Sequence, residues 1–439
     1  MNKTVKTKAR EKVDLLIVNA NELITLVGSS QKPRTGKQMR ELGIIRNGGL
    51  AVKDGRIVAV GKTIDVTKVF KAENVISANG KIALPGFVDP HTHLVFAGSR
   101  EEEFQMRVEG ASYMEILSAG GGILKTVKDT RKASFEKLVD GGLKTLDVMV
   151  EHGTTTTEAK SGYGLTTKDE LKILEVVRRL NQLHCVDVVP TFLGAHAIPT
   201  EYKGNTQGYV NLIVEDMLPK VSEKGLAEFC DVFCERGVFN LEQTRRVLVA
   251  GKNYGLKPKV HADEMSMLGG AELASDVGAV SAEHLLFSSN EGVEAMANKG
   301  VIAVLLPAAA FSLMMGQYAD ARLMIDFGVP VALGSDFNPS CWVENIQLVI
   351  AFACHFMKLT TAEAITAATI NAAHAIGRAG EVGSLEVGKK ADVVIMDVPN
   401  YKFLGYRFSV NLVDKVVKNG RLVVDKEKQG EPVFLRETE

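Results

Sequence analysis

The stretch Phe87-Val-Asp-Pro-His91-Thr-His93 reads as a short apolar strand that ends in His-x-His. Successive strand residues point to opposite faces, so His91 and His93 share one face and can reach one metal ion. Imidazole is a common ligand of zinc, iron and nickel. Two polar residues where a strand meets a turn would look the same, so the metal interpretation depends on the rest of the chain.

Three later segments end in the same way, with a His or an Asp where a small or apolar run gives way to a loop. These segments are Lys259-Val-His261-Ala-Asp-Glu264, Ser281-Ala-Glu-His284 and Ala332-Leu-Gly-Ser-Asp336-Phe-Asn338-Pro. A set made of His91, His93, His261 and Asp336 would combine nitrogen and oxygen ligands. Such a set leaves a coordination position open for water, as a hydrolytic metal centre requires.

The middle of the chain, residues 84–380, alternates short β-like runs with longer segments of helical periodicity. Eight runs recur: residues 86–93, 154–160, 186–196, 231–235, 259–264, 281–286, 301–306 and 329–336. This α/β pattern predicts a (β/α)8 TIM barrel, whose strands all open at their carboxyl ends on one face. A doubly wound open sheet is the alternative, but it would not by itself bring the first, fifth, sixth and eighth strands around one point.

The two ends of the chain resemble each other. Each contains strand-like runs separated by a hairpin signal, Asp54-Gly55 near the start and Asn419-Gly420 near the end. A two-stranded hairpin is not stable alone. We therefore expect residues 1–83 and 381–439 to form one small β-sandwich domain beside a catalytic barrel of residues 84–380.

Composition narrows the class of protein. The net charge of −1 and the lack of a basic cluster after the first dozen residues give no support for nucleic-acid or anionic membrane binding. The opening residues are hydrophilic and lack the apolar core of a secretory signal. The 5 cysteines are odd in number and irregularly spaced, which favours a reducing compartment over a disulfide framework. We expect a cytoplasmic protein.

The arrangement of these motifs resembles the amidohydrolase superfamily. The resemblance covers nearly the whole chain, and the metal motif specifies only the superfamily. The segments that carry it further are Asp89-Pro-His-Thr-His-Leu-Val-Phe-Ala-Gly-Ser-Arg100, Glu103-Phe-x-x-Arg-x-x-Gly-Ala-Ser-Tyr, Thr157-Glu-Ala-Lys-Ser-Gly-Tyr-Gly, Thr191-Phe-Leu-Gly-Ala-His196, His261-Ala-Asp-Glu264 and Gly334-Ser-Asp-Phe-Asn-Pro. The resemblance implies an amidohydrolase-type barrel with one metal ion per subunit, zinc or iron. Some relatives bridge two metals with a carboxylated lysine, but Lys160 ends the second strand, which is not the expected place.

The resemblance also implies the acid–base residues. Glu264 lies three residues beyond His261, so the loop must turn it inward; it resembles the general acid and base that moves a proton from water to the leaving nitrogen. His284 resembles either a fifth ligand or the residue that orients the water, and we prefer the second because four ligands are already present. Asp336 can accept a proton from the water while it remains bound to the metal.

The substrate implied by the resemblance is a small molecule with a carboxylate and a five-membered cyclic amide, whose ring C–N bond is hydrolysed by metal-activated water. Arg100 can hold the carboxylate with its two-pronged guanidinium group. Tyr163 can donate its hydroxyl and pack against the ring. His196 can hydrogen-bond the ring carbonyl. Any of these residues taken alone would more simply be a core or surface side chain.

The segment after Asp336 is assigned to the substrate site with one reservation about its sequence. Asn338 is expected to hold the backbone or the product end. Small residues such as Gly and Thr or Ser are usual at the next positions of this family, and this chain has Ser340 and Cys341 there. We include both as candidate substrate contacts.

Three other interpretations remain open. A heterocycle deaminase, cytosine- or guanine-like, would use the same metal, Glu264 and His284, but a neutral base needs no carboxylate clamp, and Arg100 argues against it. A non-enzymatic binding or scaffold relative would be expected to lack ligands that this chain retains. A structural zinc is disfavoured by the adjacent Glu and the position at strand ends. A homodimer is expected from symmetric-oligomer statistics and family habit alone.

Overall fold

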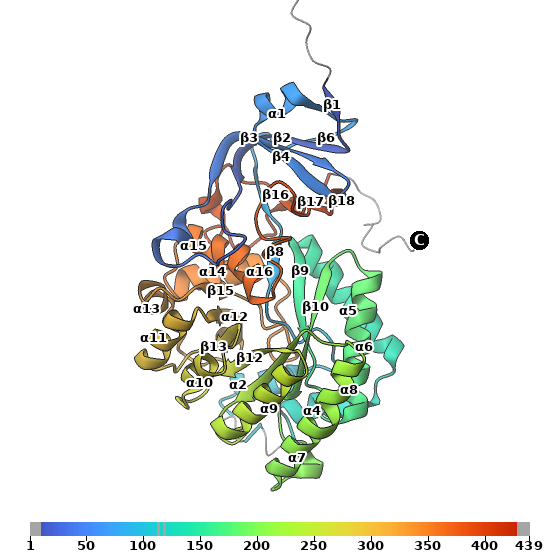
Figure 1. The fold of residues 1–439 in the computed structure, drawn as a ribbon, viewed down its shortest axis with the longest axis vertical. Helices are drawn as coiled ribbons and strands as arrows, with labels where there is room; N and C mark the ends of the chain where they lie inside the picture. The colour runs from blue at the N-terminus through green and yellow to red at the C-terminus, as the bar shows by residue number, and fades with distance from the viewer. Residues whose placement is uncertain (1–9, 112–114, 117–119, 428–439) are drawn as a thin grey trace, which may run out of the picture.

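In this computed structural model the described residues are 10–111, 115–116 and 120–427. They form a barrel covered by helices and a smaller β domain that lies at one end of it (Figure 1). Within these ranges, no helix is both long and apolar enough to cross a membrane. All 5 cysteines are free thiols, and Cys230 and Cys234 are buried on a barrel strand.

The barrel contains all eight predicted strands, paired in parallel in chain order. They are β8 (Phe87–Asp89), β9 (Thr154–Lys160), β10 (Asp187–Ala195), β11 (Phe229–Cys234), β12 (Lys257–Ala262), β13 (Ser281–His284), β14 (Ile302–Leu305) and β15 (Val331–Leu333). The first and last strands meet just beyond their ends, where the N–H of His93 donates to Phe337 O (2.8 Å) and the N–H of Asp336 donates to His91 O (3.0 Å). Three of the predicted ligands, His91, His93 and Asp336, therefore lie where the barrel closes.

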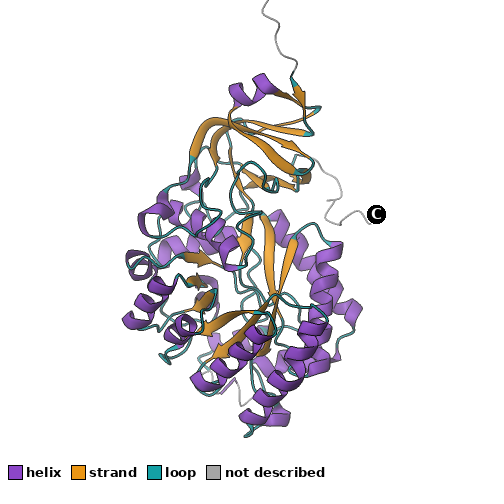
Figure 2. Ribbon diagram, viewed as in Figure 1, coloured by secondary structure: helices purple, strands orange, loops and turns teal. Residues whose placement is uncertain are grey.

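Helices surround the barrel strands on the outside (Figure 2). The longest are amphipathic and capped by side chains; Asn240, for example, accepts from the N–H of Gln243 in a capping box. The helices of this layer are α2 (Glu101–Val108), α4 (Ile123–Lys132), α5 (Phe135–Glu151), α6 (Thr167–Leu183), α7 (Thr206–Leu212), α8 (Leu218–Glu223), α9 (Leu241–Asn253), α10 (Gly270–Asp276), α11 (Asn290–Lys299), α12 (Pro307–Ser312), α13 (Ala321–Asp326), α14 (Ile346–Phe356), α15 (Thr361–Ala367) and α16 (Ile370–Ala375).

The β domain is built from both ends of the chain, as predicted. Its strands are β2 (Leu15–Ile24), β3 (Ile44–Lys53), β4 (Arg56–Lys62), β6 (Asn74–Ser77), β7 (Ile82–Pro85), β16 (Val393–Met396), β17 (Val413–Lys418) and β18 (Arg421–Asp425). They follow the order β18-β17-β16-β7-β2-β3-β4, with β6 also paired to β2. Residues of both halves, such as Ile17 and Val393, share one buried core. β7 crosses the expected domain boundary at residues 83/84.

Both predicted hairpin turns are present. Asp54 and Gly55 join β3 to β4 with φ values of 52° and 71°, and Asn419 and Gly420 join β17 to β18 with φ values of 49° and 77°. Positive φ at both central residues matches the right-handed twist of the flanking strands, which is why Asp-Gly and Asn-Gly are favoured there.

Candidate metal centre and active site

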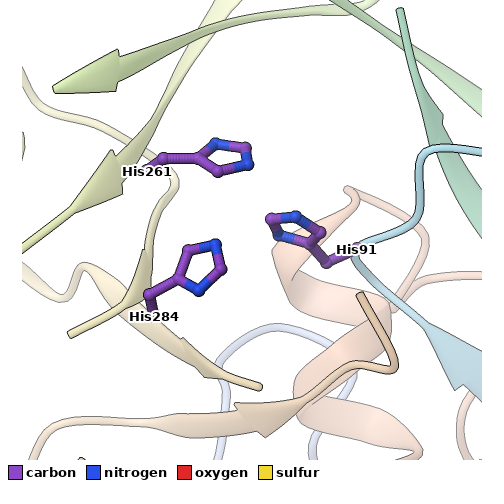
Figure 3. A group of neighbouring side chains, drawn as sticks. All are labelled: His91, His261 and His284. Carbon is purple, nitrogen blue, oxygen red and sulfur yellow. The ribbon is translucent and has the colours of Figure 1, made fainter. Parts of the chain in front are cut away.

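Four imidazoles and one carboxylate converge at the carboxyl ends of the barrel strands. Potential ligand atoms lie within 4.8 Å of one another in two groups that share His91: His91, His261 and His284 (Figure 3), and His91, His93 and Asp336. The ring centroids of His91 and His261 are 4.6 Å apart, and those of His93 and His261 are 5.6 Å apart. All four predicted ligands are thus brought together, with His284 beside them.

The donor set fits a metal ion. Nε2 of His91, Nε2 of His261 and Oδ1 of Asp336 are buried, and none has a hydrogen-bond partner in the part of the chain that the structure describes. Buried polar atoms without partners are costly, so a missing partner is expected there. Nitrogen and carboxylate donors in this number suit zinc or iron.

Three residues next to the centre have left-handed backbone conformations that non-glycine residues rarely adopt. The φ angles of Asp263, His284 and Asp336 are 49°, 70° and 51°. Each follows or ends a barrel strand. At His284 and Asp336 the conformation turns the chain where the side chain faces the centre, and at Asp263 it begins the loop that carries Glu264. Such conformations cost on the order of 1–3 kcal/mol each and concentrate at functional sites.

A fully buried charge network lies beneath the centre, inside the barrel. Nζ of Lys160 lies 2.9 Å from Glu158, 2.9 Å from Asp231 and 2.8 Å from Glu283. Nζ of Lys259 lies 2.7 Å from Glu158 and 2.8 Å from Glu283. Burial opposes ionisation of Glu283, but the two ammonium groups hold its pKa well below its usual value. We call Glu158, Lys160, Asp231, Lys259 and Glu283 the barrel charge network.

The network touches the inner nitrogens of two candidate ligands. Nδ1 of His91 lies 2.6 Å from Glu283 Oε2, and Nδ1 of His261 lies 2.8 Å from Asp231 Oδ2. A carboxylate at Nδ1 fixes the ring orientation and directs Nε2 toward the candidate metal position. Sequence reasoning missed these partners. The available signal for Asp231 was a charged residue inside the apolar run of residues 229–234, because a buried charge requires a partner.

Carboxylates of the network also have ligand spacing with His91 and His261. The ammonium group of Lys160 already lies within 2.9 Å of three of them, however, and occupies the position that a second cation would need. We therefore assign no second metal to this group.

Glu264 is turned into the cavity by a fixed loop. β12 ends at Ala262, and the Asp263 carboxylate accepts four backbone N–H groups of residues 268–271, each at 3.0 Å. Glu235 accepts the N–H of Met265 (2.9 Å) and the hydroxyl of Ser266. Burial, with Asp336 and Glu235 nearby, raises the pKa of Glu264 to about 8. Its Oε1 lies 3.6 Å from Nδ1 of His284, whose own pKa is lowered to about 3 by burial.

The predicted substrate residues share one cavity of about 360 Å³ with the centre, a volume suited to a small ligand. Arg100 is the residue before the first turn of α2 and is 8% exposed. Its Nε and Nη2 lie 2.9 and 2.8 Å from Oε2 of Glu103, whose Oε1 accepts the N–H of Gly122 (2.9 Å). Glu103 was not expected from the sequence, and it fixes Arg100 in place. The cavity is lined by all seven predicted substrate residues: Arg100, Tyr163, His196, Glu264, Asn338, Ser340 and Cys341.

Tyr163 and His196 form one wall near the centre. The Tyr163 ring lies 5.6 Å from His93 and 5.2 Å from His196, and burial raises its pKa, so the hydroxyl stays a donor. Burial and His261 lower the pKa of His196 to about 3. Nδ1 of this neutral ring donates to Gly162 O (3.0 Å), which leaves Nε2 as an acceptor. This arrangement suits acceptance of a ring N–H at Nε2, whereas a hydrogen bond from His196 to the ring carbonyl was expected from the sequence.

Asn338 is occupied by the local turn. Its Nδ2 donates to Asp336 O (2.8 Å), and its Oδ1 accepts the N–H groups of Ser340 (2.8 Å) and Cys341 (3.2 Å). The side chain therefore shapes the cavity wall. Ser340 Oγ is buried and, among the described residues, has no hydrogen-bond partner. Its hydroxyl, unlike the Asn338 side chain, is therefore available to a ligand. Burial raises the pKa of the Cys341 thiol, which stays protonated.

Known proteins confirm the class that this fold and cluster define. The model of the amidohydrolase family matches residues 82–423. The chain belongs to the amidohydrolase family, whose members are metal-dependent, and the candidate cluster is consistent with that property. Solved structures share the fold at low identity: a zinc-bound adenosine deaminase from Xanthomonas campestris (17% identical, TM-score 0.69, 98% of this chain and 96% of that one) and a guanine deaminase from E. coli (14%, TM-score 0.70, 94% and 99%).

Within that family, similar relatives carry one name. The imidazolonepropionase of Alkaliphilus metalliredigens is 54% identical over 417 residues, 94% of this chain and 99% of that protein. The imidazolonepropionase of Geobacillus sp. strain WCH70 is 56% identical over 415 residues, 93% of this chain and 98% of that protein. The similarity thus extends across both the barrel and the β domain.

Proposed function

We propose that this chain is an imidazolonepropionase. It hydrolyses the ring amide of 4-imidazolone-5-propanoate to N-formimidoyl-L-glutamate, a step of histidine degradation. The observation that carries the proposal is a cavity that contains both the metal-ligand cluster and a buried arginine, Arg100. A substrate with a cyclic amide at one end and a carboxylate at the other needs both. The relatives above 50% identity support the same reaction.

His91, His93, His261 and Asp336 would hold one zinc or iron ion per subunit. A bound ion of this kind lowers the pKa of water from 15.7 to about 7 and polarises the substrate carbonyl. Glu283 and Asp231 support the ligand set through the Nδ1 atoms of His91 and His261. The protein's own residues must then orient the substrate and move one proton.

Arg100 binds the propionate, and Tyr163 donates its hydroxyl to the ring end of the substrate. His196 accepts a ring N–H through Nε2. Glu264 accepts a proton from the attacking water and delivers it to the ring nitrogen as the C–N bond breaks. The carbonyl carbon becomes a carboxyl group, which releases the second proton of the water to solvent and leaves a carboxylate. A pKa raised to about 8 suits both halves of this transfer near neutral pH. His284, neutral and 3.6 Å from Glu264, orients the water.

The heterocycle deaminases share the barrel at 14–17% identity, which shows the fold alone. The buried Arg100 favours the carboxylate substrate over a neutral base. We further propose a cytoplasmic homodimer that acts on a small molecule, without nucleic-acid or membrane partners.

The test is the ultraviolet loss of 4-imidazolone-5-propanoate with metal-loaded protein, with the product identified by mass. We expect conversion to N-formimidoyl-L-glutamate, and loss of turnover after chelation that the metal restores. An inactive protein with metal confirmed bound would contradict the assignment. Cytosine and guanine are the control substrates, and turnover of either would favour a deaminase.

A further inference from the structure

Helix α2 directs a second arginine to the cavity that contains Arg100. Arg100 immediately precedes the helix and Arg107 lies in its last turn, seven positions on. Seven residues make about two turns, so both side chains project from the same face. Both residues line the cavity.

Glu103 lies between the two arginines along that face. Its Oε2 receives Nε and Nη2 of Arg100, and its Oε1 accepts the N–H of Gly122. Both carboxylate oxygens are therefore engaged on the Arg100 side. Glu103 neutralises one guanidinium group of the pair and leaves the other without a direct counter-charge.

Arg107 is the less satisfied of the two. Its Nε is buried and has no hydrogen-bond partner, and its guanidinium group makes no ion pair, within the ranges that the structure describes. An unsatisfied buried donor costs on the order of 1–3 kcal/mol, more when it is charged. A ligand that supplies an anionic oxygen would remove this cost.

The charges at this end of the cavity also favour one anionic ligand. Arg100 and Arg107 contribute two positive charges and Glu103 one negative charge, so a single positive charge is in excess. One carboxylate balances it. Asp336 faces the candidate metal ligands, 3.3 Å from His91 Nε2, and is not available for this purpose.

We propose that Arg107 is a second carboxylate-binding residue, and that the propionate of the substrate bridges the guanidinium groups of Arg100 and Arg107 while Glu103 fixes Arg100. This deepens the proposed function and rests on it for the identity of the substrate. The pair makes the enzyme selective for a singly charged carboxylate over a neutral side chain of the same shape.

The test compares Arg107→Gln and Arg107→Lys with Arg178→Gln, a control on the exposed face of α6. KM and kcat are measured for 4-imidazolone-5-propanoate and for its propanamide analogue, which lacks the charge. Loss of a charged hydrogen bond in Arg107→Gln should raise the KM for the acid roughly 10- to 100-fold. The kcat for the acid and the KM for the amide should change little. The KM of Arg107→Lys for the acid should be intermediate. An unchanged preference for the acid over the amide would overturn the proposal.

Binding separates this proposal from the proposed function. N-Formyl-L-glutamate, a stable carboxylate probe, is titrated into metal-loaded wild-type protein and Arg107→Gln in a calorimeter, after circular dichroism has confirmed the fold of both. Weaker binding by the variant supports the arginine pair even if the wild-type protein shows no turnover, a result that would overturn only the proposed function. Equal binding by both proteins would overturn the arginine pair.

Discussion

Replacing Lys160 with methionine tests the barrel charge network most severely. The change keeps most of the side-chain length and removes one ammonium group that contacts Glu158, Asp231 and Glu283 at 2.8–2.9 Å. All four side chains are 0% exposed. After the change, Lys259 alone remains as the ammonium partner of three buried carboxylates, and it contacts only two of them.

The expected loss of stability is large. Removing one partner of a buried ion pair costs about 3–5 kcal/mol, because the remaining charge is left uncompensated. Lys160 has three partners, so we expect the upper part of this range in the free energy of unfolding. Metal affinity should also fall, by roughly 10- to 100-fold, because Glu283 and Asp231 no longer hold His91 and His261 in a fixed orientation.

Urea unfolding of the metal-free proteins measures the first effect, and competition with a chelator measures the second. Lys168→Met, at an exposed position of α6, is the matched control and should behave as the wild type. The positioning role of the network would be refuted by a Lys160→Met protein with the metal affinity of the wild type and a free energy of unfolding within about 1 kcal/mol of it, far below the expected cost.

Three further changes have distinct outcomes. Burial, Asp336 and Glu235 raise the pKa of Glu264 from 4.5 to about 8. Between these two pH values the folded protein keeps a proton that the unfolded chain has lost. The free energy of unfolding therefore falls as the pH rises from 4.5 to about 8. Glu264→Gln keeps the neutral form and should be the more stable protein above pH 8 in urea unfolding, while turnover falls by roughly 100-fold or more; a wild-type advantage at that pH would contradict the raised pKa. Asp336→Asn should lose metal on dialysis against a chelator that leaves the wild type loaded, and equal metal contents would exclude Asp336 as a ligand. Tyr163→Phe should raise KM up to about tenfold through one lost hydrogen bond, with the unfolding midpoint nearly unchanged; a KM equal to that of the wild type would remove Tyr163 from the substrate contacts.

The barrel was predictable because its strands carry local signals. Each of the eight runs is short, β-like and followed by a helical segment, and all eight are strands. The boundaries were less predictable. β12 begins at Lys257 rather than at Lys259. A proline lacks an N–H and so weakens the strand pattern, but Pro258 still pairs in register with Cys230 of β11. Its carbonyl accepts the N–H of Val280, which a sequence pattern cannot indicate.

The site was predictable where residue type alone specifies chemistry. The histidines and Asp336 were expected at strand ends, and they converge there. The residues that hold them were not expected, because partners such as Glu283 for His91 depend on the strand register around the barrel. The same limit applies to Arg100, whose partner Glu103 is visible only once α2 is folded beside Gly122.

Ring opening by water is tested most directly by turnover of 4-imidazolone-5-propanoate in oxygen-18 water with metal-loaded protein. Mass spectrometry of the product should show one labelled oxygen, located in the newly formed carboxylate of N-formimidoyl-L-glutamate, with no ammonia released. An unlabelled product, or release of ammonia in step with loss of substrate, would contradict hydrolysis of the ring amide.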